Sequence, residues 1–304
     1  MRVSLVTTGD MELDGLPDML KGLFPDHQFY AEPFAPNKPF HGFTSATVRL
    51  LGPTDPPGNA AQLVRAALGT LVAPAGGQPP ADLSVILEDV ELCNKGAEST
   101  IVDHLRQSAN SVLGGLGPAA DPVAVRALMR TKLSFHLAAP MPESWFFGDT
   151  AALTTEVTPS RLPPLVMAGR DLEDFLTDDP AYDAATAADC VRWVAAGSPS
   201  NRKPPWLTTR RAEHPKGYLA WLLRDPSVAD SSRYKESKEG VRLLKRLDWG
   251  TVLANPDWFT YARALIRDLE SALGVPALGV PAGGVEAPLT SVHTVRATPI
   301  LRNL

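Results

Sequence analysis

The sequence has few cysteines and no long apolar run, and each absence excludes a class of protein. Its 304 residues include only Cys93 and Cys190, which lack metal-type spacing, so neither a disulfide framework nor a cysteine metal site is expected. No stretch approaches the roughly 20 apolar residues that cross a bilayer. The apolar run at residues 3–6 is too short for a signal peptide. We therefore expect a cytoplasmic protein without membrane association.

The familiar nucleotide and hydrolase motifs are also missing. The first turn carries neither Gly-x-x-x-x-Gly-Lys nor Gly-x-Gly-x-x-Gly, so nucleotide binding by those motifs is unsupported. There is no Gly-x-Ser-x-Gly elbow, and none of the six histidines pairs recognisably with a nucleophile. Serine hydrolase chemistry is therefore not expected.

Charge is unevenly distributed along the chain, although the formal net charge is only −5. Residues 202–246 hold 12 basic and 5 acidic residues, a net of +7, and the remainder holds 17 basic and 29 acidic residues, a net of −12. The total argues against a protein that wraps nucleic acid. An acidic body with one basic segment nevertheless allows local contact with phosphate.

Hydrophobic periodicity predicts an α/β body over residues 1–155. Strands are expected at residues 3–6, 28–31, 83–87 and 132–138, and helices at 13–24, 60–72, 99–113 and, as a short one, 142–147. Their alternation predicts a partly parallel, Rossmann-like sheet flanked by helices. Residues 156–304 are predicted to form a mostly helical appendage, with helices at 185–196, 215–223, 233–247 and 257–273.

An acidic run, Glu88-Asp89-Val90-Glu91, ends the most apolar predicted strand. Because strand side chains alternate, Asp89 and Glu91 project to one side and Glu88 to the other. Ligands bind at the carboxyl ends of such strands, and neighbouring carboxylates repel unless a proton or a cation such as Mg²⁺ separates them. The run favours a metal site; the alternatives are a solvated loop or the acidic start of a helix.

Two further acidic elements flank predicted strands. The turn Thr7-Thr8-Gly9-Asp10-Met11-Glu12 could hold an anion on its backbone N–H groups, and Glu12 could reach a neighbouring site. Asp10 is equally explained as a helix N-cap. Residues 142–149 combine Glu143 and Asp149 with three aromatic side chains, which core packing alone would explain.

Cationic side chains gather in the basic segment, residues 202–246, together with Trp206 and Tyr218. On the predicted helix 233–247, five of them fall within an arc of roughly 100°. Such a face can bind a phosphate backbone, and the aromatic rings can stack on bases. The alternatives are a solvated face, an acidic protein partner, a membrane surface, or the acidic body of the chain itself. The residues expected to bind nucleic acid (DNA or RNA) are Arg202, Lys203, Arg210, Arg211, Lys216, Lys235, Lys238, Arg242 and Lys245.

The three acidic elements together resemble the TOPRIM fold, and more narrowly the TOPRIM-like proteins of bacteria, some of which are encoded beside ATPases in anti-phage loci. That group carries Val-Glu-Gly-x-Thr-Glu after the first strand, Asp-x-Asp at a later strand end, and then Phe-Glu-Ala-x-Leu-Phe-x-Asp. The matching residues here are Gly9 and Glu12, Asp89-Val90-Glu91, and residues 142–149. Thr8 stands where the group has its first Glu, so Asp10 or Glu12 would have to replace that carboxylate.

The resemblance implies a Mg²⁺- or Mn²⁺-dependent nuclease that cleaves nucleic-acid phosphodiesters and acts as an effector of anti-phage defence. It implies that Glu12, Asp89 and Glu91 are catalytic and that Asp89, Glu91, Glu88 and Glu143 are metal ligands. The alternative opened by Thr8 is a catalytically inactive sensor or adaptor, whose basic segment docks a protein partner such as an ATPase.

Overall fold

The structure is a computed structural model that describes residues 1–45, 58–72, 74, 77–118, 120–156, 161–185, 210–223, 234–275 and 299–304. The predicted helix at 185–196 lies outside these ranges apart from its first residue, as do Arg202, Lys203 and Trp206. Across the described ranges, no helix combines the length and the apolar character that a membrane crossing requires.

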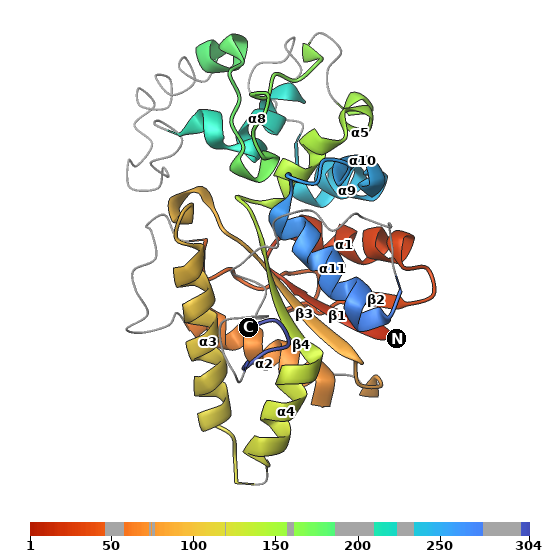
Figure 1. Ribbon diagram of the computed structural model, residues 1–304, viewed down its shortest axis with the longest axis vertical. Helices are drawn as coiled ribbons and strands as arrows, with labels where there is room; N and C mark the ends of the chain where they lie inside the picture. Colours follow the sequence, from red (N-terminus) through yellow and green to blue (C-terminus); the bar gives the residue numbers. More distant parts are fainter. Residues whose placement is uncertain are drawn as a thin grey trace.

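A four-stranded parallel sheet in the order β2-β1-β3-β4 forms the centre of the molecule (Figure 1). The strands are β1 (Arg2–Thr7), β2 (Gln28–Ala31), β3 (Leu83–Asp89) and β4 (Leu133–Ala138). Every neighbouring pair is parallel, because each connection between consecutive strands contains at least one helix. The predicted α/β architecture, a sheet flanked by helices, is confirmed, and the sheet is wholly parallel.

Helices cover both faces of this sheet. In Figure 1, α1 (Asp10–Leu23) and α11 (Thr260–Leu273) lie on one side of the strands, and α2 (Gly58–Val72) and α3 (Glu98–Gly114) lie on the other. The remaining elements are α4 (Pro122–Lys132), α5 (Thr150–Thr154), α8 (Pro215–Leu222), α9 (Val241–Arg246), α10 (Trp249–Val252), the 3-10 turns η2 (Leu92–Asn94), η3 (Pro142–Gly148), η5 (Leu172–Asp174) and η7 (Arg211–Glu213), and the π-helix η8 (Glu236–Gly240).

The alternation of strand side chains divides the core into two clusters, one on each face. Val3 and Leu5 of β1 join the cluster under α1 and α11, whereas Val6 joins the cluster under α2 and α3. In β3, Leu87 belongs to the first cluster and Ile86 to the second. It follows that Asp89 emerges on the α1 side and Glu88 on the α2 side.

The helix α4 was not predicted from the periodicity, and residue 132, expected to open a strand, instead ends this helix. Its apolar side chains are mostly exposed and Met129 is its one buried residue, so the hydrophobic pattern that marks other helices is weak. Its ends carry clearer signals: Asp121 caps the first turn by accepting from the Val123 N–H, and Pro122 follows at the first helical position.

The second half of the chain packs directly onto the α/β body. The predicted helix at 233–247 divides into η8 and α9, and α9 lies against α1. The helix α11 lies against β4, and the core cluster on this face combines Leu16 and Leu20 with Leu244 and Leu269. The predicted boundary near residue 155 stays a prediction, and the hydrophobic core runs across it.

Asn303 protects the free edge of β4, and we expect its loss to weaken the fold. Its buried amide accepts from the Phe135 N–H at 2.9 Å and donates to the Phe135 carbonyl. Asn303→Ala would leave both backbone groups unpaired and should lower the free energy of unfolding by about 1–3 kcal/mol, measured by urea titration. Asn303→Asp keeps the acceptor but sets a buried carboxylate oxygen against the Phe135 carbonyl, so it should lose at least as much. Equal stability of all three proteins would contradict this role.

Candidate functional site

The carboxyl ends of the parallel strands β1, β3 and β4 lie at the same edge of the sheet, and each is followed by an acidic element. β1 leads into the turn that carries Glu12, β3 ends at Asp89 and is followed by Glu91, and β4 is followed by η3, which carries Glu143. In an open parallel sheet this edge is where ligands bind. The structure therefore brings together four residues that the sequence could only place on separate elements. We call Glu12, Asp89, Glu91 and Glu143 the carboxylate cluster.

Burial and mutual repulsion perturb the carboxylate cluster strongly. Burial raises the pKa of Asp89 well above its usual value, and the charges of Glu12, Glu91 and Glu143 raise it further. Burial, followed by the charge of Glu143, raises the pKa of Glu12 to about 8. The pKa of Glu91 rises to about 7, again chiefly through burial. The titrations of these carboxylates are thus linked, because the charge of each raises the pKa of its neighbours.

Gly9 makes room for the Glu12 side chain. A Cβ atom at position 9 would lie 2.1 Å from Glu12 Oε2, so any other residue there would push this carboxylate away. Glu12 itself is 3% exposed although it lies in the first turn of α1. The expected N-cap role of Asp10 is wrong in detail, because Gly9 occupies the N-cap position and Asp10 is the first helical residue.

Glu91 has a strained backbone, with φ 62° and ψ 151°. This conformation is rare for residues other than glycine and costs on the order of 1–3 kcal/mol. The Glu91 N–H donates to the Pro140 carbonyl at 2.8 Å, and the preceding Val90 N–H donates to the Ala138 carbonyl at 2.9 Å. The chain thus holds Glu91 in an unfavourable geometry at the end of β3, which is typical of a functional position.

Two residues of the second half reach the carboxylate cluster. The Tyr234 hydroxyl donates to Glu143 Oε1 at 2.9 Å, and burial together with the Glu143 charge raises the pKa of Tyr234 well above its usual value. Lys216, at the start of α8, lies with Nζ 4.0 Å from Glu143 Oε1 and also pairs with Glu236. Tyr234 was missed from the sequence, where a single tyrosine 91 residues from Glu143 gives no signal.

Glu88 projects from the face of the sheet opposite to Asp89, although its charge still raises the pKa of Asp89. It lies on the α2 side, where its Oε1 accepts from the Thr44 N–H at 3.0 Å and from the Thr44 hydroxyl at 2.6 Å. Burial raises its pKa to about 7, although these bonds and the Thr8 hydroxyl lower it. A Cβ atom at Gly42 would lie 2.8 Å from the same oxygen, so the loop is fitted closely around Glu88. Thr44 was also missed from the sequence.

The cluster offers carboxylate oxygens, the donors that hard divalent cations prefer. Across the described ranges, however, no group of three or more His, Cys, Asp or Glu side chains is arranged to hold a metal ion. Asp89 and Glu91 are partly exposed, whereas Glu12 and Glu143 are buried. A ligand would therefore meet Asp89 and Glu91 first.

Most described cations of the basic segment are paired with carboxylates of the chain. Arg210 binds Glu213, Arg211 binds Asp183, Arg242 binds Glu156 and Glu239, and Lys245 binds Asp18 at 2.7 Å. Arg246 also binds Glu156, at 2.9 Å. The acidic body of the chain is thus the partner of much of this basic surface, as one of the alternatives expected. Exposed ion pairs of this kind contribute little to stability.

Lys235 and Lys238 differ from the other cations of this segment. Both are exposed, and neither forms an ion pair with any residue that the structure describes. They do not share one α-helical face with Arg242 as predicted, because Lys238 lies in the π-helix η8, whose wider turns change the angular spacing, and Lys235 precedes it. Lys235 follows Tyr234 directly, so one free cation lies next to the residue that contacts Glu143.

Asp149, the last residue of the third acidic element, has a structural role. Its carboxylate caps α5 by accepting from the Ala152 N–H at 3.1 Å and accepts from the Asp248 N–H at 2.9 Å. The aromatic residues of the same element are buried, and the Trp145 and Trp249 rings meet edge-on with centroids 5.4 Å apart. The core packing expected for these aromatics is confirmed.

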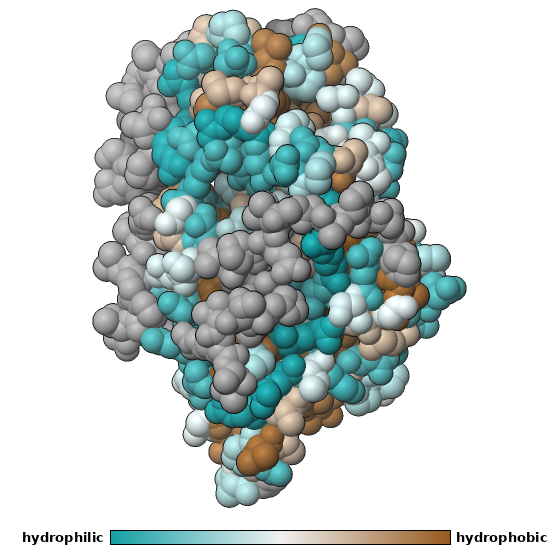
Figure 2. Space-filling model, viewed as in Figure 1, coloured by the Kyte–Doolittle hydropathy of each residue, from teal (hydrophilic) through white to brown (hydrophobic). Residues whose placement is uncertain are grey.

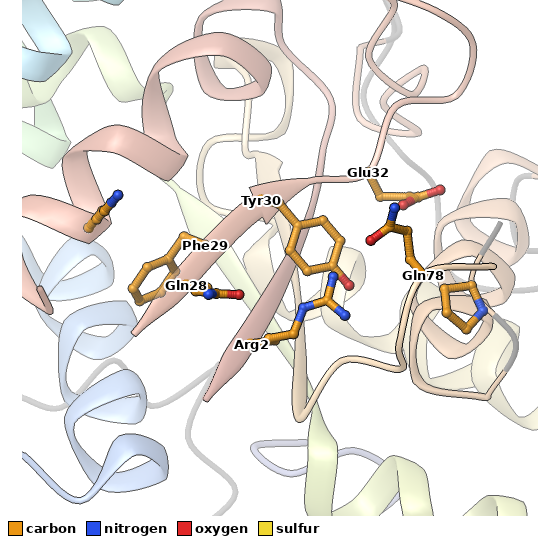
Figure 3. A pocket seen from close by; sticks show the side chains of 8 residues that line it. Arg2, Gln28, Phe29, Tyr30, Glu32 and Gln78 are labelled. Carbon is orange, nitrogen blue, oxygen red and sulfur yellow. The ribbon is translucent and has the colours of Figure 1, made fainter. Parts of the chain in front are cut away.

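The surface carries a hydrophilic region, and a pocket lies apart from it. Hydrophilic residues gather on one face at the level where the helices around α8 meet the α/β part of the molecule (Figure 2). A pocket of about 510 Å³ lies elsewhere, beside the edge strand β2, where the Arg2 guanidinium lies 5.2 Å from the centre of the Tyr30 ring (Figure 3). None of the predicted site residues lines this pocket.

Comparison with known proteins identifies no relative of this chain. The chain matches no protein-family model, no curated protein and no solved structure. What the protein does must therefore be argued from the site itself.

Proposed function

We propose that the protein is a Mg²⁺- or Mn²⁺-dependent nuclease of the TOPRIM-like type, acting on nucleic-acid phosphodiesters. The observation that carries this proposal is the meeting of Glu12, Asp89, Glu91 and Glu143 at the carboxyl ends of β1, β3 and β4. The chain keeps these carboxylates together against burial and repulsion, and it keeps Glu91 in a strained backbone, which are costs that stability alone does not explain.

A hard divalent cation suits donors of this chemistry. Mg²⁺ commonly takes one or two protein carboxylates and completes its shell with water and substrate phosphate, so a set of three prearranged protein ligands is not required. Asp89 and Glu91, which are partly exposed, would hold it. When bound, such a cation neutralises charge on a phosphate and lowers the pKa of a bound water.

The residues around the carboxylate cluster have complementary tasks. Glu91 is partly exposed and follows the end of β3, so its carboxylate is placed to meet a cation together with that of Asp89. Tyr234 holds Glu143 in place by donating to its Oε1. Lys235 and Lys238 are the exposed cations that would contact the phosphate backbone, and such contacts position a nucleic acid without reading its sequence.

At Thr8, where the chain departs from the TOPRIM-like pattern, a carboxylate lies on the neighbouring strand. The register pairs Thr7 with Leu87, so Thr8 comes next to Glu88, and its hydroxyl lowers the pKa of Glu88. Because Glu88 faces the α2 side, the carboxylate that the group carries at this position would here be replaced by Glu12, which is buried in the carboxylate cluster. The same resemblance supports a role as an effector of anti-phage defence.

The test is cleavage of DNA and RNA, single- and double-stranded, with Mg²⁺, with Mn²⁺ and with a chelator. We expect metal-dependent cleavage that is lost when Asp89→Ala is combined with Glu91→Ala. A matched control combines Asp14→Ala with Asp26→Ala, two exposed carboxylates in and just after α1, and should cleave like the wild type. Metal-dependent cleavage that survives the first double substitution would refute the site assignment.

The second candidate function is a catalytically inactive sensor or adaptor that docks a protein partner such as an ATPase. Two observations favour it: the described residues include no prearranged group of three metal ligands, and most described cations of the basic segment are already paired. Calorimetric titration with Mg²⁺ separates the two functions. Binding that disappears with Asp89→Ala supports the nuclease, and a wild type that binds no Mg²⁺ supports the adaptor.

A further inference from the structure

The loop that follows β2 carries an exposed aromatic ring. Phe34 is 47% exposed, and among the Phe, Tyr and Trp side chains that the structure describes it alone is exposed. Its ring meets the ring of the buried Phe40 edge-on, with centroids 5.7 Å apart, and lies 6.2 Å from the ring of the exposed His41. A large part of the Phe34 ring therefore stays open to a flat ligand.

A tight turn fixes the position of this ring. The Lys38 N–H donates to the Ala35 carbonyl at 2.9 Å, and the Phe34 N–H donates to the Lys38 carbonyl at 3.0 Å. Pro36 and Asn37 occupy the centre of the turn, and Asn37 has φ 57°, a value that asparagine tolerates. An aromatic side chain on a preformed turn loses little conformational entropy when a ligand binds.

The same loop is attached to the carboxyl edge of the sheet, where the carboxylate cluster lies. The Phe40 N–H donates to the carbonyl of Thr7, the last residue of β1, at 3.2 Å. Farther along, Thr44 donates its N–H and its hydroxyl to Glu88 near the end of β3. Phe40 and Phe43 are buried in the core cluster under α2 and α3. The loop thus starts from the carboxyl end of one strand and crosses to those of two others.

Charge and size favour a nucleobase as the partner of this ring. Residues 33–45 contain no Asp or Glu, although the chain has a formal net charge of −5. Lys38, at the end of the turn, is exposed and forms no ion pair with any residue that the structure describes. The phosphate beside a stacked base would therefore meet a cation and no carboxylate of this loop. One exposed ring suits one base, whereas a specific protein interface buries roughly 800 Å² on each partner.

We propose that Phe34 is a stacking platform for an unpaired base of a single-stranded nucleic acid, with Lys38 contacting the neighbouring phosphate. The inference rests on the proposed function and deepens it, because it assigns a single-stranded segment as the substrate at this edge of the sheet. Stacking on an aromatic ring tolerates any base, since every base has a π-face. The platform positions the strand and takes no part in the chemistry, so binding to it needs no metal.

The experiment is fluorescence anisotropy of a labelled single strand of about 12 nucleotides, of DNA or of RNA, titrated with the full chain in the presence of a chelator. Phe34→Leu keeps an apolar side chain but removes the aromatic face, and it should weaken binding roughly 10-fold. Phe34→Trp keeps an aromatic face and should bind like the wild type. Val123→Ala is the matched control, because Val123 is also an exposed apolar residue, on α4, and should leave the affinity unchanged.

Salt dependence separates stacking from charge. Lys38→Met removes one phosphate contact and should reduce the slope of log K against log salt by roughly 0.7. Phe34→Leu should lower the affinity at every salt concentration and leave this slope unchanged, and it should have little effect on a duplex, whose bases are already paired and stacked. An unchanged slope in Lys38→Met would overturn the phosphate contact.

Because binding is measured without metal, its outcomes are distinct from those of the cleavage test. Equal affinity of the wild type and Phe34→Leu for single strands overturns the platform and leaves the nuclease to its own test. Weaker binding by Phe34→Leu supports the platform even where Mg²⁺ and Mn²⁺ give no cleavage, a result by which the nuclease alone fails. A wild type that binds no single strand overturns the platform and leaves the ring to a protein partner.

Discussion

Without divalent metal, the melting temperature of the protein is expected to fall as the pH rises from 6.5 to 8. Glu12 and Glu173 have pKa values of about 8, and Glu88 and Glu91 have values of about 7, all above the value of 4.5 for an unperturbed glutamate. In this window the folded protein therefore holds protons that the unfolded chain has released. Stability that depends on those protons is complete below pH 4.5 and is lost as the pH rises through the raised values.

This pH window lies above the range in which His214, whose pKa shift has the opposite sign, changes its contribution to stability. Burial lowers the pKa of His214 from 6.5 to about 3, so its contribution to stability is complete above pH 6.5 and is lost only as the pH falls. Each pKa unit corresponds to about 1.4 kcal/mol, and the four carboxyl groups together should cost about 5 kcal/mol across the window. For a chain of this size we expect a fall of roughly 5–10 °C, measured by calorimetry or fluorescence.

Mg²⁺ should reverse part of this loss. A cation that binds the deprotonated native cluster stabilises the folded state by mass action, and it does so more at pH 8 than at pH 6.5. Glu173 gives the internal control, because it lies outside the cluster and accepts from the Tyr261 and Ala262 N–H groups at the start of α11. Glu173→Gln should flatten the pH dependence without changing the Mg²⁺ effect. A melting temperature that rises across the window would contradict the raised pKa values.

The fold was largely predictable because its signals are local. Residues 28–31 were predicted as a strand with the observed limits, and the apolar run at 83–87 lies within β3. The placement of Glu88 opposite Asp89 followed from the two-residue period of a strand alone. The helix α4 was not predicted because it buries few apolar side chains and so has no hydrophobic stripe. Its sequence signals are the N-cap Asp121 and the first helical residue Pro122.

The candidate site was predictable only in its separate parts. That Glu12, Asp89 and Glu143 belong to one site was expected only from the resemblance to TOPRIM-like proteins, and the structure places them at the shared carboxyl edge of three parallel strands. Tyr234, Thr44 and the strain at Glu91 depend on how distant segments pack, and no short pattern records this. The basic segment shows the converse: its charges were visible in the sequence, but their pairing with Glu156 and Asp18 required the folded chain.

Asp89→Asn is expected to make the metal-free protein more stable and to abolish the proposed nuclease activity. The substitution keeps the size of the side chain and removes the carboxylate on which the charges of Glu12, Glu91 and Glu143 act. At pH 8 we expect a gain of about 1–3 kcal/mol in the free energy of unfolding, because a buried like-charge repulsion is removed. Stabilisation by Mg²⁺ should disappear, and nuclease activity should fall by roughly 100-fold or more.

Asp149→Asn is the matched control, because the same change at Asp149 should lower stability. Asp149 is a buried aspartate, whereas Asp89 is partly exposed. It comes from the acidic element that carries Glu143, where it caps α5 and accepts from the Asp248 N–H. Its replacement should lower stability by about 1 kcal/mol and leave the Mg²⁺ effect intact. Opposite shifts in the two variants would show that Asp89 is kept for binding and not for folding, since selection tolerates lost stability where function requires it. A loss of stability in Asp89→Asn comparable to that in Asp149→Asn would instead assign Asp89 to the architecture of the fold.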